Sequence, residues 1–539
     1  MNYDPDLVRA ATREETFPVA LGSVLLALIA LLVCFSRGYL LLYGDAVAHL
    51  GIARRILDSH NPGLVQLGGV WLPLPHLLML PFVQTMAWWQ NGLAGAWPSM
   101  LCYIVGVVGF YRLARHLLLP RWAVVATAFY ALNPNLLYLA TTAMTEPLFL
   151  ALLIWTTLLT VECLEAVSAA RDGFVARRLL LLGMTILAAV YTRYDGWILG
   201  AAVWCVVAVA LARRRDVWRN VVPSFVCFTL LAVAGPVSWL AYNQYFFHDP
   251  LDFLRGPYSA SAIEKKTATA GSGHHPGWHN PFWAFVYYTR TAQVDAAFWE
   301  TGFLAMAAAL FGLVLAVRRR AALASLLLWI PLPFYVYSVA YGSVPIFIPQ
   351  LWPFSYYNSR YGMELLPALA LFAFLAAQWV EVRSASQPLV KRLMQPVCLL
   401  LVALNAVGMI YRTPLVLNEA FKNSTTRIAF ESALARQLMT LPAGSTILMY
   451  NSDHVGALQA AAIPLKQTIN EGDRDSFQTA LAAPAEHAAY VVGIAGDPVA
   501  AAVAEHPEGL IELTILCTSG QPCARIYQSD RAASTMPKP

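Results

Sequence analysis

Long apolar runs separated by short clusters of Lys and Arg recur through most of the chain. A run of about 20 residues can cross the roughly 30 Å hydrocarbon core of a bilayer as one helix. Composition agrees with repeated crossings, since 58% of the 539 residues are hydrophobic and 12% are charged, whereas a soluble protein carries about 25% charged residues. We therefore predict a polytopic α-helical membrane protein. The basic clusters report topology and do not form a nucleic-acid-binding face.

The positions of the basic clusters predict the order of the membrane helices, because such clusters concentrate on the cytoplasmic side. The apolar stretch 76–90 is too short to cross and is interrupted by prolines, so we expect it to lie at the interface. About eleven crossings then keep every cluster on one side, with the N-terminus in the cytoplasm. They are expected near 17–36, 99–118, 122–139, 147–167, two short spans within 179–212, 221–245, 299–317, 321–341, 361–380 and 393–411.

Composition changes near residue 412, which divides the expected protein into two domains. Residues 1–411 form the membrane domain, with outer-face loops at 37–98 and 246–298. Residues 412–539 alternate a helical pattern with short β-rich runs, which indicates a small α/β domain outside the cytoplasm. We expect this arrangement in a plasma (inner) membrane.

The polar tail also contains two cysteines, Cys517 and Cys523, with turn residues between them. Their spacing is compatible with a disulfide in an oxidising compartment. The sequence leaves open whether they are bridged. The expected strands of the tail are Ser445–Tyr450, Ala489–Ile494, Leu510–Cys517 and Ala524–Gln528, with a helix over Thr426–Leu441.

Several ionisable residues share the outer face on this topology, and their convergence favours a functional site. Asp45 begins a stretch in which apolar residues recur at helical spacing, which predicts an amphipathic helix parallel to the membrane surface. The residues are Asp45 and His49 in the first loop, Glu146 in TTAMTEPLF, Arg193 and Asp195 in YTRYDGW, Lys265 in the 246–298 loop, and Arg360 in YYNSRYGMELLP.

Each of these residues has a structural alternative when taken alone. Asp45 is suited to cap the helix that follows it, and Glu146 to compensate a helix dipole ahead of Pro147. Arg193 and Asp195 are close enough in sequence for a local salt bridge. Arg360 suits a snorkelling position at a helix end. His49 suits either an interfacial histidine or a metal ligand.

The order and sidedness of these features resemble the membrane glycosyltransferases of the GT-C fold. The resemblance covers residues 20–410 and is greatest to the family 39-like branch of protein O-mannosyltransferases and lipid A aminoarabinose transferases. It rests on Asp45 in the first outer loop, the interfacial helices after it, Glu146 in a TEPLF-type loop, and Arg360-Tyr361 before a Pro-containing helix. Many relatives have Asp-Glu where this chain has Asp45-Ala46.

The resemblance implies a transferase that moves a hexosyl or pentosyl group from a polyprenyl-phosphate carrier to an acceptor outside the cytoplasm, with inversion. The acceptor is a protein, lipid or glycan. Asp45 matches the general base, and Glu146 matches an acidic position that supports a divalent metal in some relatives, with His49 as a second candidate ligand. The remaining roles fall to Arg360, Arg193 and Lys265 for the donor phosphate, and to His49, Trp71, His76, Asp195 and Tyr361 for substrate.

These roles are chemically coherent. An acceptor hydroxyl that attacks an anomeric carbon needs a carboxylate to take its proton, and a leaving phosphate is matched by an arginine fork. Trp71 and Tyr361 suit either a sugar face or the aromatic belt of the membrane.

A transporter or flippase of a lipid-linked or small solute is the alternative function. Transporters often contain inverted repeats and broken helices at the midplane; the sequence has no evident repeat, and its charges gather at one surface. A membrane-anchored scaffold would leave those charges unexplained.

Overall fold

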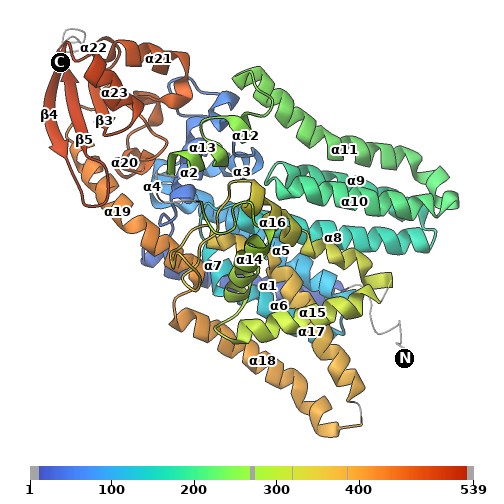
Figure 1. Ribbon diagram of the computed structural model, residues 1–539. Helices are drawn as coiled ribbons and strands as arrows, with labels where there is room; N and C mark the ends of the chain where they lie inside the picture. Colours follow the sequence, from blue (N-terminus) through green and yellow to red (C-terminus); the bar gives the residue numbers. More distant parts are fainter. Residues whose placement is uncertain (1–10, 268–273, 319, 385, 531–539) are drawn as a thin grey trace.

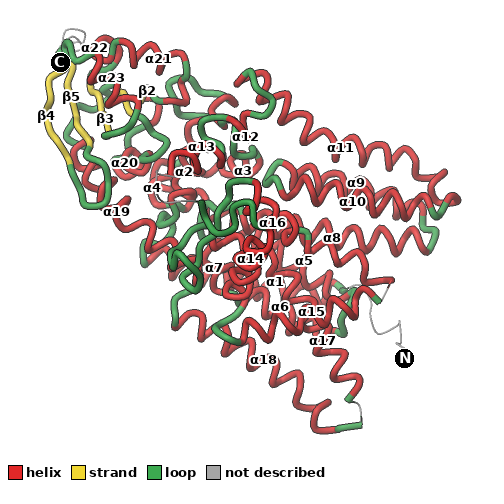
Figure 2. Tube along the Cα trace, in the orientation of Figure 1, coloured by secondary structure: helices red, strands yellow, loops and turns green. Residues whose placement is uncertain are grey.

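Helices make up most of the structure, and a five-stranded sheet gathers at one end of the molecule (Figure 1). The computed structural model describes residues 11–267, 274–318, 320–384 and 386–530. Figure 2 shows helices over most of the chain, with the strands at the end that holds the C-terminal residues and a further group of loops near α14 and α16.

Nine helical segments of the described residues are long and apolar enough to cross a membrane, or ten if a bent pair counts as one span. The chain is therefore a multi-pass membrane protein, as the sequence predicted. The nine are α1 (Arg13–Ser36), α5 (Leu93–Arg115), α8 (Glu146–Ser168), α9 (Asp172–Val190), α10 (Asp195–Ala212), α11 (Arg215–Phe247), η3 with α16 (Arg320–Trp329 and Pro331–Tyr341), η4 with α17 (Ser359–Leu365 and Leu366–Arg383), and α18 with α19 (Pro388–Tyr411 and Leu415–Leu438). The bent pair is α14 (Pro281–Ala296) and α15 (Thr301–Val317), which meet at 109°.

Two of the eleven expected crossings account for the lower count. Helix α6 (Pro120–Ala131) has 12 residues, which extend about 18 Å at 1.5 Å per residue, less than a bilayer core. It ends early because Asn133 caps a new helix, α7 (Pro134–Leu139), whose first position is a proline. Helix α15 has 17 residues and turns away from α14 instead of extending it.

The predicted break within 179–212 is present between α9 and α10. Residues 191–194 connect the two helices, so Arg193 lies at their shared end and not in the middle of one long helix. A Cβ on Gly196 would lie 2.4 Å from the carbonyl oxygen of Ala189. Only glycine allows the first turn of α10 to approach α9 this closely.

Short helices take the place of the two long loops. The first loop contains α2 (Gly44–Arg55), η2 (Leu64–Leu67), α3 (Leu74–Val83) and α4 (Met86–Asn91). The second, expected as a polar loop over 246–298, contains α12 (Asp252–Arg255), α13 (Ala260–Thr267) and α14. Helix α3 has 10 residues and is too short to be among the nine spans.

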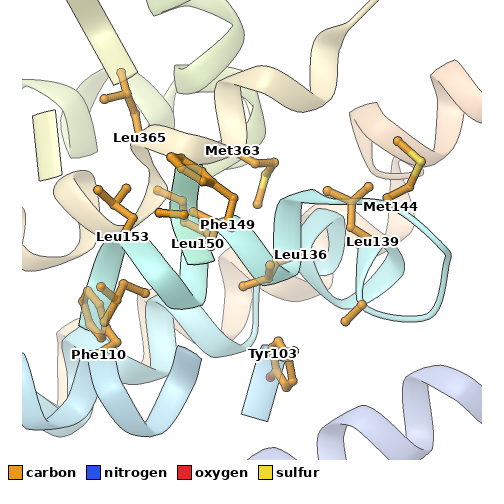
Figure 3. Close-up of a cluster of buried hydrophobic side chains, with 14 of the residues drawn as sticks. Tyr103, Phe110, Leu136, Leu139, Met144, Phe149, Leu150, Leu153, Met363 and Leu365 are labelled. Carbon is orange, nitrogen blue, oxygen red and sulfur yellow. The ribbon is translucent and has the colours of Figure 1, made fainter. Parts of the chain in front are cut away.

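The apolar core of the membrane part holds two of these segments in place. Phe149, Leu150 and Leu153 of α8 lie in one buried cluster with Met363 and Leu365 of the η4 segment (Figure 3). All five side chains are 1% exposed or less. Glu146 and Arg360 stand at the starts of these two elements, so the core fixes the positions of both.

The C-terminal sheet has the strand order β2-β1-β3-β5-β4. Strands β1, β2 and β3 are parallel, with Leu448 opposite Ile469 and Val491, while β5 runs antiparallel to both β3 and β4. The elements are β1 (Ile447–Met449), α20 (Val455–Ala460), η5 (Leu465–Gln467), β2 (Thr468–Ile469), η6 (Glu471–Asp473), α21 (Asp475–Ala482), α22 (Pro484–His487), β3 (Tyr490–Ile494), α23 (Pro498–Glu505), β4 (Leu510–Leu516) and β5 (Ala524–Ser529).

Four of these strands match the runs expected from sequence, and β2, which has two residues, was missed. Cys517 and Cys523 form a disulfide across the turn between β4 and β5. The tail helix differs more from the expectation. Helix α19 begins at Leu415 instead of near Thr426, because Leu415, Val416 and Ala420 are buried against the membrane helices.

Candidate functional site

Arg360 occupies the centre of a cluster formed by segments far apart in the sequence. Its Nη2 lies 2.5 Å from Oδ2 of Asp45, and its Nε lies 3.0 Å from Oε1 of Glu146. Its Nη1 lies 3.7 Å from Oε1 of Glu419 on α19. The Arg360 side chain is 8% exposed, so it is buried among carboxylates and does not snorkel to the surface.

Arg193 forms a second centre beside the first. Its Nη1 lies 3.3 Å from the same Glu146 oxygen, and its Nε lies 3.4 Å from Asp195 and 3.1 Å from Glu364. Tyr335 bonds to both ends of this group, since its hydroxyl accepts from Arg193 Nη2 at 2.6 Å and donates to Glu364 at 2.7 Å. The local ion pair with Asp195 is thus one of several contacts of this guanidinium.

Glu146 and Tyr361 join the two arginines into one unit. A single oxygen of Glu146 accepts hydrogen bonds from both guanidinium groups. The other oxygen, Oε2, is buried and has no hydrogen-bond partner among the residues that the structure describes. The ring of Tyr361 lies 4.9 Å from the Arg360 guanidinium carbon and 5.0 Å from that of Arg193. Cation–π attraction at these distances helps to hold two like charges near one another.

Local backbone features position each of these side chains. Asp45 lies in the first turn of α2, where the N-cap is Tyr43 and no side chain caps the helix. The interpretation of Asp45 as an N-cap is therefore wrong. Glu146 is the first residue of α8, before Pro147 at a position that favours proline. A Cβ on Gly362 would lie 2.6 Å from Asp295 Oδ2, so glycine lets the Arg360 segment pack closely on α14.

The loop that carries Arg360 is held by the tail. Glu419 accepts hydrogen bonds from the backbone N–H of Asn358 at 2.9 Å and of Ser359 at 2.7 Å. It also accepts from the Ser359 hydroxyl. Asn358 has a φ of 53°, a left-handed conformation that asparagine adopts more readily than most residues. Helix α19 thus contributes a buried carboxylate to the cluster.

His49, Trp71 and His76 form an aromatic wall on the α2 side of the cluster. The His49 and Trp71 ring centroids are 4.3 Å apart. His76 Nδ1 lies 3.1 Å from the carbonyl oxygen of Leu72, which accepts only, so this nitrogen carries the proton. His76 Nε2 then accepts from His49 Nδ1–H at 2.8 Å. This assignment leaves His49 Nε2 with a lone pair.

Burial keeps both histidines neutral. Burial, together with the nearby positive charges of Arg360 and Arg193, lowers the pKa of His49 from 6.5 to about 3. Burial also lowers the pKa of His76 well below its usual value, with His49 and Arg55 acting in the same sense. The pair can therefore accept and donate hydrogen bonds near neutral pH without adding charge.

One carboxyl group of the cluster is much more accessible than the others. The Asp45 side chain is 41% exposed, whereas those of Glu146, Asp195, Glu364 and Glu419 are 2% exposed or less. A reactant that enters from solvent would meet Asp45 before any of the buried carboxyl groups.

The structure brings together Asp45, His49, Trp71, His76, Glu146, Arg193, Asp195, Arg360 and Tyr361, which is nearly the whole predicted set. Lys265 is the exception. It is an exposed residue of α13, and no contact described for the cluster includes it.

The environment of Glu146 does not suit a metal. Two guanidinium groups contact its Oε1, and a divalent cation at this carboxylate would be repelled by both. Within the described ranges, no group of three or more His, Cys, Asp or Glu side chains is arranged to hold a metal ion. A metal at Glu146 would have to compete with both guanidinium groups for this oxygen.

Sequence reasoning missed Glu364, Tyr335 and Glu419. Glu364 stands four residues after Arg360 in the same motif, so helical spacing offered a signal for it. Tyr335 lies in an apolar run and resembles a packing residue. Glu419 lies beyond the last apolar run, and no local pattern connects it to Arg360.

Two comparisons with known proteins found similarities to this chain. The family model of dolichyl-phosphate-mannose-protein mannosyltransferases matches residues 76–239. The crystal structure of ArnT from Cupriavidus metallidurans bound to undecaprenyl phosphate covers 96% of this chain and 99% of its own, with a TM-score of 0.56 at 14% identity. ArnT in the apo state covers 96% and 100%, with a TM-score of 0.54 at 16% identity. By sequence, no curated protein matches the chain.

These similarities confirm the fold expected from sequence: the chain has the architecture of the GT-C membrane glycosyltransferases, with a small C-terminal sheet domain. The family match includes Glu146, Arg193 and Asp195 and supports a glycosyltransferase.

Proposed function

We propose that this protein transfers a sugar from a polyprenyl-phosphate carrier to an acceptor hydroxyl by a single, inverting displacement. The observation that carries the proposal is the half-exposed carboxylate of Asp45 beside the buried Arg360–Glu146–Arg193 unit. A base that solvent can reach, beside guanidinium donors that are already oriented, is the pairing that such a displacement requires.

In this reaction the acceptor oxygen attacks the anomeric carbon and forms the new glycosidic bond. The bond from that carbon to the phosphate oxygen breaks, and the polyprenyl phosphate leaves with the electron pair. Asp45 takes the acceptor proton. The transition state is oxocarbenium-like, so the nearby negative charge of Asp45 also stabilises it.

Arg360 and Arg193 stabilise the negative charge that develops on the leaving phosphate. Both are already oriented by carboxylates and by the Tyr361 ring, so little reorganisation is needed when the charge develops. Arg360 Nη2 pairs with Asp45, and an arriving phosphate would compete for that donor. Donor binding then releases Asp45 from Arg360 and leaves it free to act as the base.

The aromatic wall suits the sugar. The lone pair on His49 Nε2 accepts a sugar hydroxyl, and Trp71 offers an apolar face beside it. His76 fixes the tautomer of His49. Asp195 acts on the substrate through its position beside Arg193. Lys265, which is exposed on α13, reaches the donor phosphate only if its helix moves.

The location follows from the same proposal. The cluster lies on the extracytoplasmic side of a plasma (inner) membrane, where residues 412–539 form a domain beside the membrane domain of residues 1–411. The mannosyltransferase family that matches residues 76–239 is named for a dolichyl-phosphate donor, and one ArnT structure holds undecaprenyl phosphate, which supports a donor of the same lipid-phosphate class here.

The test is a transfer assay with purified protein in lipid nanodiscs. Radiolabelled polyprenyl-phosphate sugars are supplied with candidate acceptors, and release of free polyprenyl phosphate is measured together with labelled product. Transfer that depends on Asp45 supports the proposal. If the protein instead moves labelled lipid-linked sugar across a sealed vesicle without breaking the glycosyl–phosphate bond, it is a flippase and the proposal fails.

A further inference from the structure

A cavity lies outside the arginine–carboxylate cluster, where the ends of α14, α18 and α19 meet. Its volume is about 400 Å³, within the roughly 300–1,000 Å³ range of small-ligand sites. Its polar lining comes from Arg290, Gln350, Arg412, Thr413 and Asn418, and Trp299 supplies an aromatic face.

The two arginines of this cavity have no acidic partner among the described residues. Arg290 donates to Gln293 and lies 4.4 Å from the ring of Phe303. Arg412 lies 3.9 Å from the ring of Trp299. Arg193 and Arg360, in contrast, each contact three carboxylates. Two uncompensated guanidinium groups on one concave wall favour an anion from outside the chain.

The cavity also lies at the expected membrane boundary. Arg412 is the first residue after α18, and Met409, in the last turn of that helix, lines the apolar side. Trp299, 55% exposed, occupies the short connection between α14 and α15. A cavity with an apolar side against a membrane helix and cationic groups at the helix end matches an amphiphile with a charged head.

We propose that this cavity binds the phosphate-bearing head group of a membrane lipid. The phosphate lies between Arg290 and Arg412, whose planar forks match phosphate oxygens, and Asn418 and Gln350 offer hydrogen bonds to the group attached to it. Stacking on Trp299 pre-orients the Arg412 guanidinium and leaves its N–H donors free.

The site is distinct from the cluster but lies next to it. Asn418 lines the cavity, and the next residue, Glu419, holds the Arg360 loop. Neighbouring residues of a helix point about 100° apart, so α19 presents one side chain to each site. Because the two sites use different side chains, lipid binding in the cavity can be measured separately from sugar transfer.

The experiment measures binding of dioctanoyl phosphatidic acid to the detergent-purified full-length protein by native mass spectrometry and titration calorimetry. Dioctanoylglycerol, which lacks the phosphate, and inorganic phosphate are the comparison probes. The variants are Arg290→Gln, Arg412→Gln and Gln350→Glu, the last of which adds a negative charge without removing an arginine. Arg383→Gln is the matched control, because Arg383 ends α17 and lies 5.7 Å from the ring of Trp379 but does not line the cavity.

We expect phosphatidic acid to bind, with affinity about tenfold weaker in each arginine variant, the usual scale for losing a charge-assisted hydrogen bond. Gln350→Glu weakens binding in the same direction, and Arg383→Gln leaves it unchanged. Wild-type binding in both cavity-arginine variants overturns the proposal, as does equal binding of dioctanoylglycerol. If inorganic phosphate binds as tightly and with the same arginine dependence, the site takes a free anion, and the assignment to a lipid head group is wrong. Gln350→Glu keeps the test decisive if an arginine variant fails to fold.

Discussion

The substitution Asp45→Asn should separate transfer from carrier binding. Asparagine keeps the size of the side chain but cannot take a proton from the acceptor. General-base catalysis contributes about 10²–10⁴-fold, so we expect the transfer rate to fall by that factor. The loss corresponds to about 3–5 kcal/mol in the activation free energy.

The geometry of the Asp45–Arg360 ion pair sets the expected effects of the substitution on stability and on carrier binding. Asp45 Oδ2 lies 2.5 Å from Arg360 Nη2, but the Asp45 side chain is 41% exposed. Exposed pairs are worth about 0–1 kcal/mol, so the free energy of unfolding should change by no more than that. Since Asp45 competes with the donor phosphate for Arg360, its neutralisation should tighten carrier binding by up to about fivefold, the equivalent of 1 kcal/mol.

The assay is single-turnover transfer in nanodiscs, with carrier affinity measured separately by titration of polyprenyl phosphate. Asp58→Asn is the matched control. Asp58 also pairs with an arginine, Arg54, but this pair lies at the C-terminal end of α2, whereas Asp45 lies in its first turn. The control should transfer at the wild-type rate. Transfer by Asp45→Asn within threefold of wild type would refute the base assignment, and weaker carrier binding would refute the competition for Arg360.

Three further outcomes are expected. Arg360→Lys keeps the charge but loses the fork, so carrier affinity should fall about tenfold in the titration; unchanged affinity would reduce Arg360 to a structural role. Glu419→Gln leaves the loop N–H groups and Arg360 less well paired, so the free energy of unfolding should fall by about 1–3 kcal/mol in a denaturant titration, and kcat should fall with little change in the KM for the acceptor; wild-type values of both would contradict this role. The pKa of His49 is about 3 in the folded protein and 6.5 in the unfolded chain. Between these values only the unfolded state binds the proton, so the free energy of unfolding should decrease as the pH falls below 6.5, by up to about 1.4 kcal/mol per pH unit. The slope of stability against pH should become shallower in His49→Gln but not in the exposed His60→Gln; equal slopes would mean that His49 is protonated in the folded protein.

Much of the membrane architecture was predictable because two constraints act over the whole chain. Helix length is tied to bilayer thickness, and basic loops share one side. Together they placed the break between α9 and α10, where Arg193 lies. The same constraints overestimated the length of α6. The new helix that starts at Asn133-Pro134 is a local signal, and hydropathy averaged over a long window does not detect it.

The site was predictable only where charge interrupts an apolar pattern. Asp45, Glu146, Arg193 and Arg360 stand out because charge is costly near a membrane. Their mutual distances were not predictable, since they depend on how η4 packs against α8 and α14. The partners that complete the cluster were hidden for the same reason: Tyr335 resembles any core aromatic residue.

The contact of Glu419 with the Arg360 loop bears on any chimaera assembled from this protein. Hydropathy suggests exchanging the soluble tail at a junction after Tyr411, but that graft would remove an acidic group on which the loop depends. A junction after Leu438 keeps helix α19 with its native bundle, so only the sheet and its short helices would be interchangeable between relatives.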